Sequence, residues 1–146
     1  MPSAPLSFIA TLGALDLYVG KDDQWVVQQG PHACDTAGLR ARASLLWLPL
    51  LEQDYATVRH VLLTGLAAAV SEHAARRWAA FPVQELVLLG LAPSSSPYWV
   101  NLALAWTAHI EPGPEVLRQV QVMSLDPLMP QPIRHLAKRL FYTGES

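Results

Sequence analysis

The stretch DYATVRHVLLTGLAAAVSEHAARRWAA, residues 54–80, decides the fold class of this chain. Its apolar residues recur at three- and four-residue spacing, which is the period of one face of an α-helix. They are Tyr55, Val58, Leu62, Leu66, Ala69 or Val70, Ala74 and Trp78. Asp54 can accept a hydrogen bond from a free amide of the first turn. The pattern therefore predicts a long helix that begins after Asp54 and ends near Ala80, before Pro82.

Four shorter helices are expected downstream, each opened by a proline, because the fixed φ and missing amide donor of proline suit a first helical turn. They are predicted at residues 83–92, 98–110, 115–124 and 133–142, after Pro82, Pro97, Pro114 and Pro132. The connections are short, so consecutive helices should be close neighbours and roughly antiparallel. The 98–110 segment is apolar almost all round, which indicates the central helix.

A further helix is predicted upstream, over residues 37–52, where apolar side chains again fall at helical spacing. Thr36 is its expected N-cap. Pro49 lies inside the pattern and lacks an amide donor, so we expect the helix to bend or end early there.

The first 31 residues indicate a β-hairpin. Residues 15–19 alternate apolar and polar side chains, residues 20–23 supply turn chemistry, and residues 24–28 provide the second strand. A helix over residues 7–17 is the alternative for this N-terminal segment.

The spacing of the helix pairs resembles that of HEAT-type α-helical repeats. Pro82 and Pro114 are 32 residues apart, and Pro97 and Pro132 are 35 apart, within residues 55–142. The resemblance implies a curved stack of helix pairs used as a binding surface, with no shared catalytic residues. We therefore expect a mainly α single domain over residues 1–146, helical from 36 to 142. Its roughly six helices form either a right-handed stack of HEAT-like pairs or a compact irregular bundle.

Composition excludes several classes of protein. Hydrophobic residues make up 51% of the chain, charged residues 15%, and the net charge is −2. No basic face typical of nucleic-acid binding is present, and no apolar run approaches the roughly 18 residues of a membrane span. Cys34 is the single cysteine, and no basic residue precedes Lys21 to form a signal peptide. These features favour a cytoplasmic protein.

Residues that could carry chemistry do not form a known motif. His32 and Cys34 are the one local pair that suggests a nucleophilic thiol. The five histidines lack the helical spacing of a zinc site, and no glycine-rich phosphate loop is present. We expect no catalytic residue, no metal and no cofactor.

The sequence favours a protein that binds another protein. Five tryptophans are a high number for this length, and tryptophan is enriched at binding hot spots. Trp25 on the hairpin and Trp99 in a first helical turn are expected at the surface, with Asp22, Asp23 and Glu111 as acidic contacts. Small size, mild acidity and the lack of motifs favour a bacterial immunity-type protein that neutralises a toxin or effector by covering it.

Two alternatives belong to other classes of function. One is a small-ligand binder or small enzyme, with a pocket between helices where Trp, His and Cys34 converge. The other is a structural subunit that forms a homo-oligomer. In addition, Arg76 with Arg77 and the basic face over residues 134–139 are candidates for binding phosphate, acidic lipid or an acidic protein patch.

Overall fold

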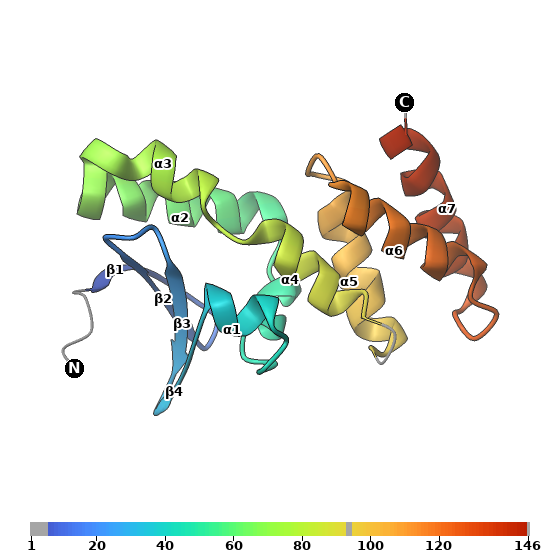
Figure 1. Ribbon diagram of the computed structural model, residues 1–146, viewed down its shortest axis with the longest axis horizontal. Coiled ribbons are helices and arrows are strands. Elements are labelled where there is room, and N and C mark those ends of the chain that lie inside the picture. The colour runs from blue at the N-terminus through green and yellow to red at the C-terminus, as the bar shows by residue number, and fades with distance from the viewer. Residues whose placement is uncertain (1–5, 93–94, 146) are drawn as a thin grey trace. The chain divides into compact units, whose positions relative to one another are not determined.

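The computed structural model describes residues 6–92 and 95–145, with side chains as far as Thr143 (Figure 1). The chain divides into two compact units, Met1–Pro82 and Val83–Ser146. The fold is mainly helical, with an antiparallel sheet of four strands at the N-terminal end. The single domain over residues 1–146 and the stack of HEAT-like helix pairs stay predictions.

The first unit begins with a sheet in which every strand pairs with its neighbour in sequence. The strands are β1 (Leu6–Leu12), β2 (Leu15–Gly20), β3 (Trp25–Gln29) and β4 (His32–Asp35), in the order β1-β2-β3-β4. The predicted hairpin is confirmed as β2 and β3, with Asp23 at a φ of 62° in its turn. The alternative helix over residues 7–17 is wrong, because β1 and the first half of β2 occupy that segment.

The predicted helix over residues 37–52 is also wrong. The chain forms a short helix α1 (Thr36–Arg40) and, after a turn, the 3-10 helix η1 (Leu48–Glu52). Arg42 has a left-handed φ of 56°, and the amide of Ala43 donates to the carbonyl of Gly38 at 2.9 Å, so the helix cannot continue. Asp35, not Thr36, caps α1, and Pro49 lies in the first turn of η1.

The first part of the predicted long helix is confirmed as α2 (Tyr55–Val70), and the side chain of Asp54 accepts from the amide of Thr57 at 3.3 Å. The expectation that the same helix continues to near Ala80 is wrong. The helical path is broken after Val70, whose φ of −142° and ψ of 48° lie outside the α region. The 3-10 turn η2 (Ser71–His73) and the helix α3 (Ala74–Ala79) follow.

The core of the first unit lies between the sheet and α2. The inward side chains of the strands and the middle of the predicted stripe of α2 are buried; they include Leu15, Leu17, Val19, Trp25, Val27, Val58, Leu62 and Leu66. Tyr55 and Val70, at the ends of the stripe, are partly exposed. At Gly65 an added Cβ would stand 2.3 Å from the backbone oxygen of Ile9, so α2 lies directly against β1 at this glycine. Trp25 packs edge-on against Phe81, with ring centroids 5.2 Å apart.

The described residues of the second unit form four helices, and all four proline-opened helices are confirmed. They are α4 (Val83–Gly90), α5 (Pro97–Thr107), α6 (Pro114–Leu125) and α7 (Gln131–Glu145). Helices α4 and α7 each contact both α5 and α6. The side chain of Gln84 accepts from the amide of Gly113 and donates to the carbonyl of Glu111, both at 2.9 Å, and so ties α4 to the start of α6. None of the described helices combines the length and the hydropathy needed to cross a bilayer.

Candidate interaction surface

The outer face of the sheet presents apolar side chains to solvent. Side chains alternate along a strand, so Leu15, Leu17 and Val19 point into the core while the residues between them point outward. The strand register places Phe8 opposite Tyr18, and Tyr18 opposite Val26, so these three side chains form a row across β1, β2 and β3.

This row is partly exposed rather than buried. Phe8 is 51% exposed, and Leu6, two residues earlier on the same strand face, is 48% exposed. The rings of Phe8 and Tyr18 meet edge to face with centroids 5.5 Å apart, an arrangement that holds both rings in place. We refer to Leu6, Phe8, Tyr18 and Val26 as the outer apolar row.

Carboxylates border the outer apolar row. Asp16 lies on the same face and accepts a hydrogen bond from the hydroxyl of Thr11 at 2.6 Å. Asp35 is the register partner of Val26, and its carboxylate caps α1 by accepting from the amide of Gly38 at 2.8 Å. No lysine or arginine occupies an outward-facing position of the four strands. The border of the row is therefore acidic.

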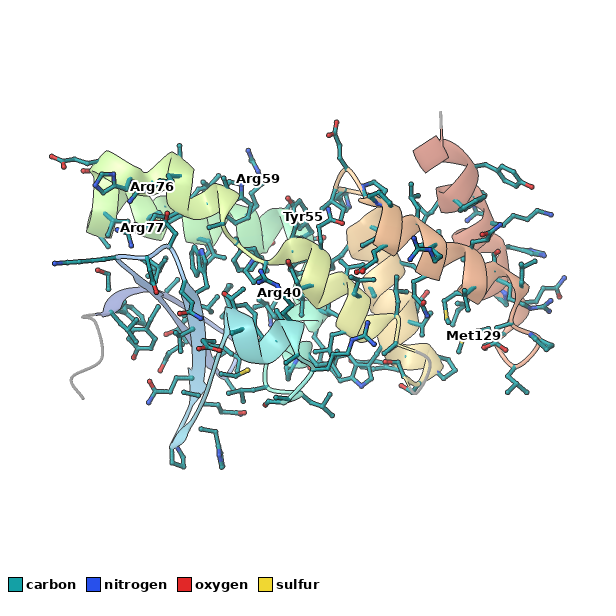
Figure 2. The ribbon with its side chains drawn as sticks, viewed as in Figure 1. Arg40, Tyr55, Arg59, Arg76, Arg77 and Met129 are labelled. Carbon is teal, nitrogen blue, oxygen red and sulfur yellow. The ribbon has the colours of Figure 1, made fainter. Side chains whose placement is uncertain are left out.

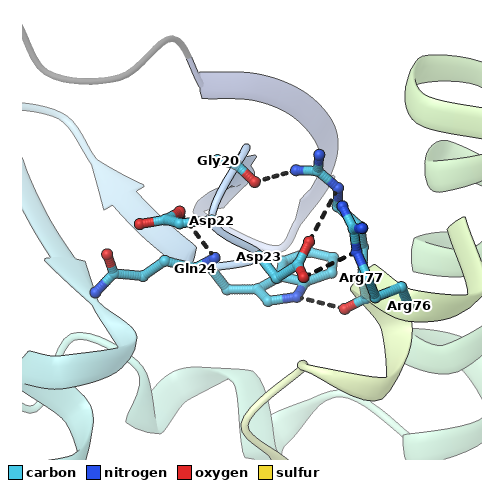
Figure 3. Close-up of polar contacts among 7 residues, drawn as sticks. Gly20, Asp22, Asp23, Gln24, Arg76 and Arg77 are labelled. Carbon is cyan, nitrogen blue, oxygen red and sulfur yellow. Dashed lines mark hydrogen bonds and ion pairs between the residues drawn. The ribbon is translucent and has the colours of Figure 1, made fainter. Parts of the chain in front are cut away.

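An ionic cluster fixes the β2–β3 turn to α3 (Figures 2 and 3). Asp23 lies between two arginines, with its Oδ2 3.0 Å from Arg76 Nε and its Oδ1 3.3 Å from Arg77 Nε. Arg77 is almost fully buried, and its guanidinium also donates to the carbonyl of Gly20. The backbone carbonyl of Arg77 accepts from the indole of Trp25 at 2.9 Å.

One contact of this cluster is ionic without being a hydrogen bond. Asp23 Oδ1 and Arg77 Nε are buried, and neither has a hydrogen-bond partner, because the N–H does not point at the carboxylate oxygen. The attraction between the two charges is consequently what compensates the burial of both atoms. The two arginines are engaged within the fold, which leaves Arg77 no surface for a phosphate.

The structure separates the predicted contact residues. Asp22 is exposed in the β2–β3 turn, where its Oδ1 accepts from the amide of Gln24 at 3.2 Å. Asp23 is three-quarters covered by the ionic cluster. The expectation that Trp25 is exposed is wrong: its side chain is completely buried, because the strand alternation directs it inward against Phe81.

The other two predicted contact residues belong to the second unit. Trp99 is half-buried, and its ring meets that of Tyr98 at a centroid distance of 5.0 Å. Glu111 is exposed between α5 and α6. Sequence reasoning missed the outer apolar row altogether. The alternating pattern of β2 indicates that Asp16 and Tyr18 point outward. Leu6 and Phe8 belong to β1, and the sequence pattern did not predict that β1 pairs with β2.

Cys34 does not have the surroundings of a reactive thiol. Its side chain is buried against Gly38, where an added Cβ would lie 2.8 Å from the sulfur. Burial raises the pKa of the Cys34 thiol, and the neighbouring carboxylate of Asp35 raises it further. His32 is exposed on the same strand, and the described contacts of the sulfur do not include its imidazole. The thiol therefore stays protonated at neutral pH.

Among the residues that the structure describes, no three His, Cys, Asp or Glu side chains gather closely enough to hold a metal ion. Comparison of the chain with protein-family models, with curated proteins and with solved structures gives no significant match. Function has to be inferred from the surface of the molecule itself.

Proposed function

We propose that this chain is a non-catalytic binding protein that acts by covering a surface of another protein, and that the outer apolar row is the centre of the contact. The observation that carries this proposal is the exposure of Leu6 and Phe8 beside Tyr18 and Val26 on one face of the sheet. Apolar side chains gathered on one face mark interaction sites more often than scattered ones do. Covering the exposed half of Phe8 alone would contribute about 1 kcal/mol to binding.

The chemistry of the partner follows from the border of the row. Asp16 and Asp35 border the apolar centre, and no outward-facing strand position is basic. A complementary partner has an apolar centre and a rim of lysine or arginine. Such charges accelerate association and make it dependent on salt, whereas the apolar centre sets how long the complex lasts.

Within this class we propose an immunity-type inhibitor, which neutralises a toxin or effector by occupying its basic surface in the cytoplasm. The mildly acidic composition and the acidic border of the row support this narrower proposal. The alternatives are a small-ligand binder and a self-associating structural subunit. The second of these would use the same apolar row but would not require a basic partner.

The test compares two equivalent substitutions in the first unit. Phe8→Thr removes the aromatic ring from the outer row while keeping a residue that favours strands. Leu45→Thr makes the same kind of change at a leucine that is 66% exposed outside the sheet. Each variant and the unaltered chain serve as bait in a pull-down from the native source, at two salt concentrations. The captured partner is then purified and titrated by calorimetry.

The proposal predicts one stoichiometric partner, whose affinity falls about fivefold with Phe8→Thr and is unchanged with Leu45→Thr. Asp16→Asn should lower the association rate and reduce its dependence on salt. Equal binding by the Phe8 and Leu45 variants would exclude the outer row as the contact. Capture of the chain by itself, with mass increasing with concentration, would favour the structural subunit.

A further inference from the structure

The exposed face of α7 carries four hydrogen-bond donors at helical spacing. His135, Lys138, Arg139 and Tyr142 occupy positions i, i+3, i+4 and i+7, and so lie along one side of the helix. Together they line a shallow depression of about 310 Å³. Tyr142 is 61% exposed, and the three other side chains are also exposed.

Lys138 and Arg139 make this face basic. Among the side chains that the structure describes, no carboxylate pairs with Lys138, Arg139 or His135. Lys138 and Arg139 are adjacent in sequence and both are exposed, so two like charges lie next to each other on this face. The opposite side of α7, with Ile133 and Ala137, is buried in the second unit. The basic face therefore contributes nothing to helix packing and is free to meet an anion.

We propose that this depression binds the phosphoryl or diphosphoryl group of a small soluble molecule. The guanidinium of Arg139 offers two parallel donors, the ammonium of Lys138 a point charge, and the phenol of Tyr142 a neutral donor, which suits the several oxygens of a phosphate group. A depression of this size is at the lower limit of small-molecule sites. The site lies in the second unit and does not depend on the function proposed for the sheet.

Inorganic pyrophosphate is the probe. It is titrated into the ¹⁵N-labelled full chain, and the amide shifts of residues 135–142 are followed at constant ionic strength, which is maintained with sodium chloride. We expect the shifts to saturate with a Kd on the order of 1 mM, because an open site leaves the anion largely hydrated. Shifts that do not saturate, or that sodium chloride reproduces, would overturn the proposal.

Matched variants locate the site. Lys138→Gln and Arg139→Gln should each weaken pyrophosphate binding about fivefold. Arg118→Gln removes an exposed arginine from α6 and should leave the affinity unchanged. Equal weakening by all three variants would show general charge attraction and refute a site on α7. Far-UV circular dichroism of each variant verifies that the helices are intact.

A second arm distinguishes a soluble ligand from a lipid head group. The chain is mixed with phosphatidylcholine vesicles that contain phosphatidic acid and is then floated on a density gradient. Absence of flotation together with saturable pyrophosphate binding supports the soluble ligand. Flotation that is lost with Lys138→Gln, without saturable binding of pyrophosphate, would overturn the proposal in favour of a membrane surface.

Discussion

Removing the carboxylate of Asp23 should destabilise the first unit, because it isolates a buried arginine. Arg77 has a side chain that is 7% exposed, and Asp23 supplies its ionic partner at 3.3 Å. Breaking a fully buried pair costs about 3–5 kcal/mol, and breaking an exposed pair costs below about 1 kcal/mol. The side chain of Asp23 is 24% exposed, so we expect Asp23→Asn to cost about 2 kcal/mol.

Asparagine is the appropriate replacement because it removes the negative charge and keeps the shape of the side chain. Asp23 has a φ of 62°, and asparagine tolerates this left-handed conformation as aspartate does, whereas alanine would add backbone strain. Asp22→Asn is the matched control, with the same chemical change one residue earlier. The Oδ1 of Asp22 accepts from the amide of Gln24 in an exposed turn, and an amide oxygen can do the same. We expect the control to change stability by less than about 0.5 kcal/mol.

Urea unfolding, followed by tryptophan fluorescence and circular dichroism, measures both variants. With an m-value of about 2 kcal/mol/M, the midpoint of Asp23→Asn should fall by about 1 M. A second variant, Arg77→Met, tests the pairing, because its cost should be smaller in the Asp23→Asn background than in the unaltered chain. If the Asp22 and Asp23 variants unfold at the same urea concentration, the ionic cluster does not stabilise the turn and our interpretation of it is wrong.

Three further predictions concern the first unit. Gly65→Ala should destabilise it by more than about 1 kcal/mol in urea unfolding, despite the higher helix propensity of alanine, because the new methyl group would meet the backbone of Ile9 at 2.3 Å; a stabilised variant would contradict this close contact. Trp25→Phe should cost about 1–3 kcal/mol, because the carbonyl of Arg77 loses its donor; a neutral effect would mean that another group replaces the indole. Cys34 should react slowly with iodoacetamide in the folded chain and quickly in urea. Burial raises the pKa of its thiol in the folded state. The contribution of this thiol to stability is therefore complete below about pH 8.5, where the unfolded chain also keeps it protonated, and is lost as the pH rises further. Cys34→Ala should lack this alkaline loss.

The helices were predictable where local signals agree with packing. Asp54 before an apolar stripe, and prolines in first turns such as Pro97 and Pro114, mark helix starts that depend on neighbouring residues alone. The helix predicted over residues 37–52 failed because tertiary contacts prevailed over periodicity. The indole of Trp47 donates to the carbonyl of Cys34 at 3.1 Å and holds this segment against the end of β4.

The sheet was predictable only in part. The β2–β3 hairpin alternates strictly, but the pairing of β1 shifts register between Phe8 and Ala10, so Ile9 interrupts the period of two. The outer apolar row was therefore not predictable, since half of it belongs to β1. The hairpin pattern alone contains no information on the helices that cover its inner face, and for this reason the surface position expected for Trp25 is wrong.

Because each strand pairs with its neighbour in sequence, the sheet can form during synthesis before helix α2 is made. Adjacent strands are joined by short turns, so their loops close early and quickly, and the whole sheet can pair once residue 35 is available. Leu62 and Leu66, which cover the inner face, are made later. Until then the nascent sheet exposes apolar side chains on both faces, and self-association of chains competes with folding. Helix α2 covers the apolar side chains of the inner face once it is made. The apolar side chains of the outer face remain exposed in the folded molecule.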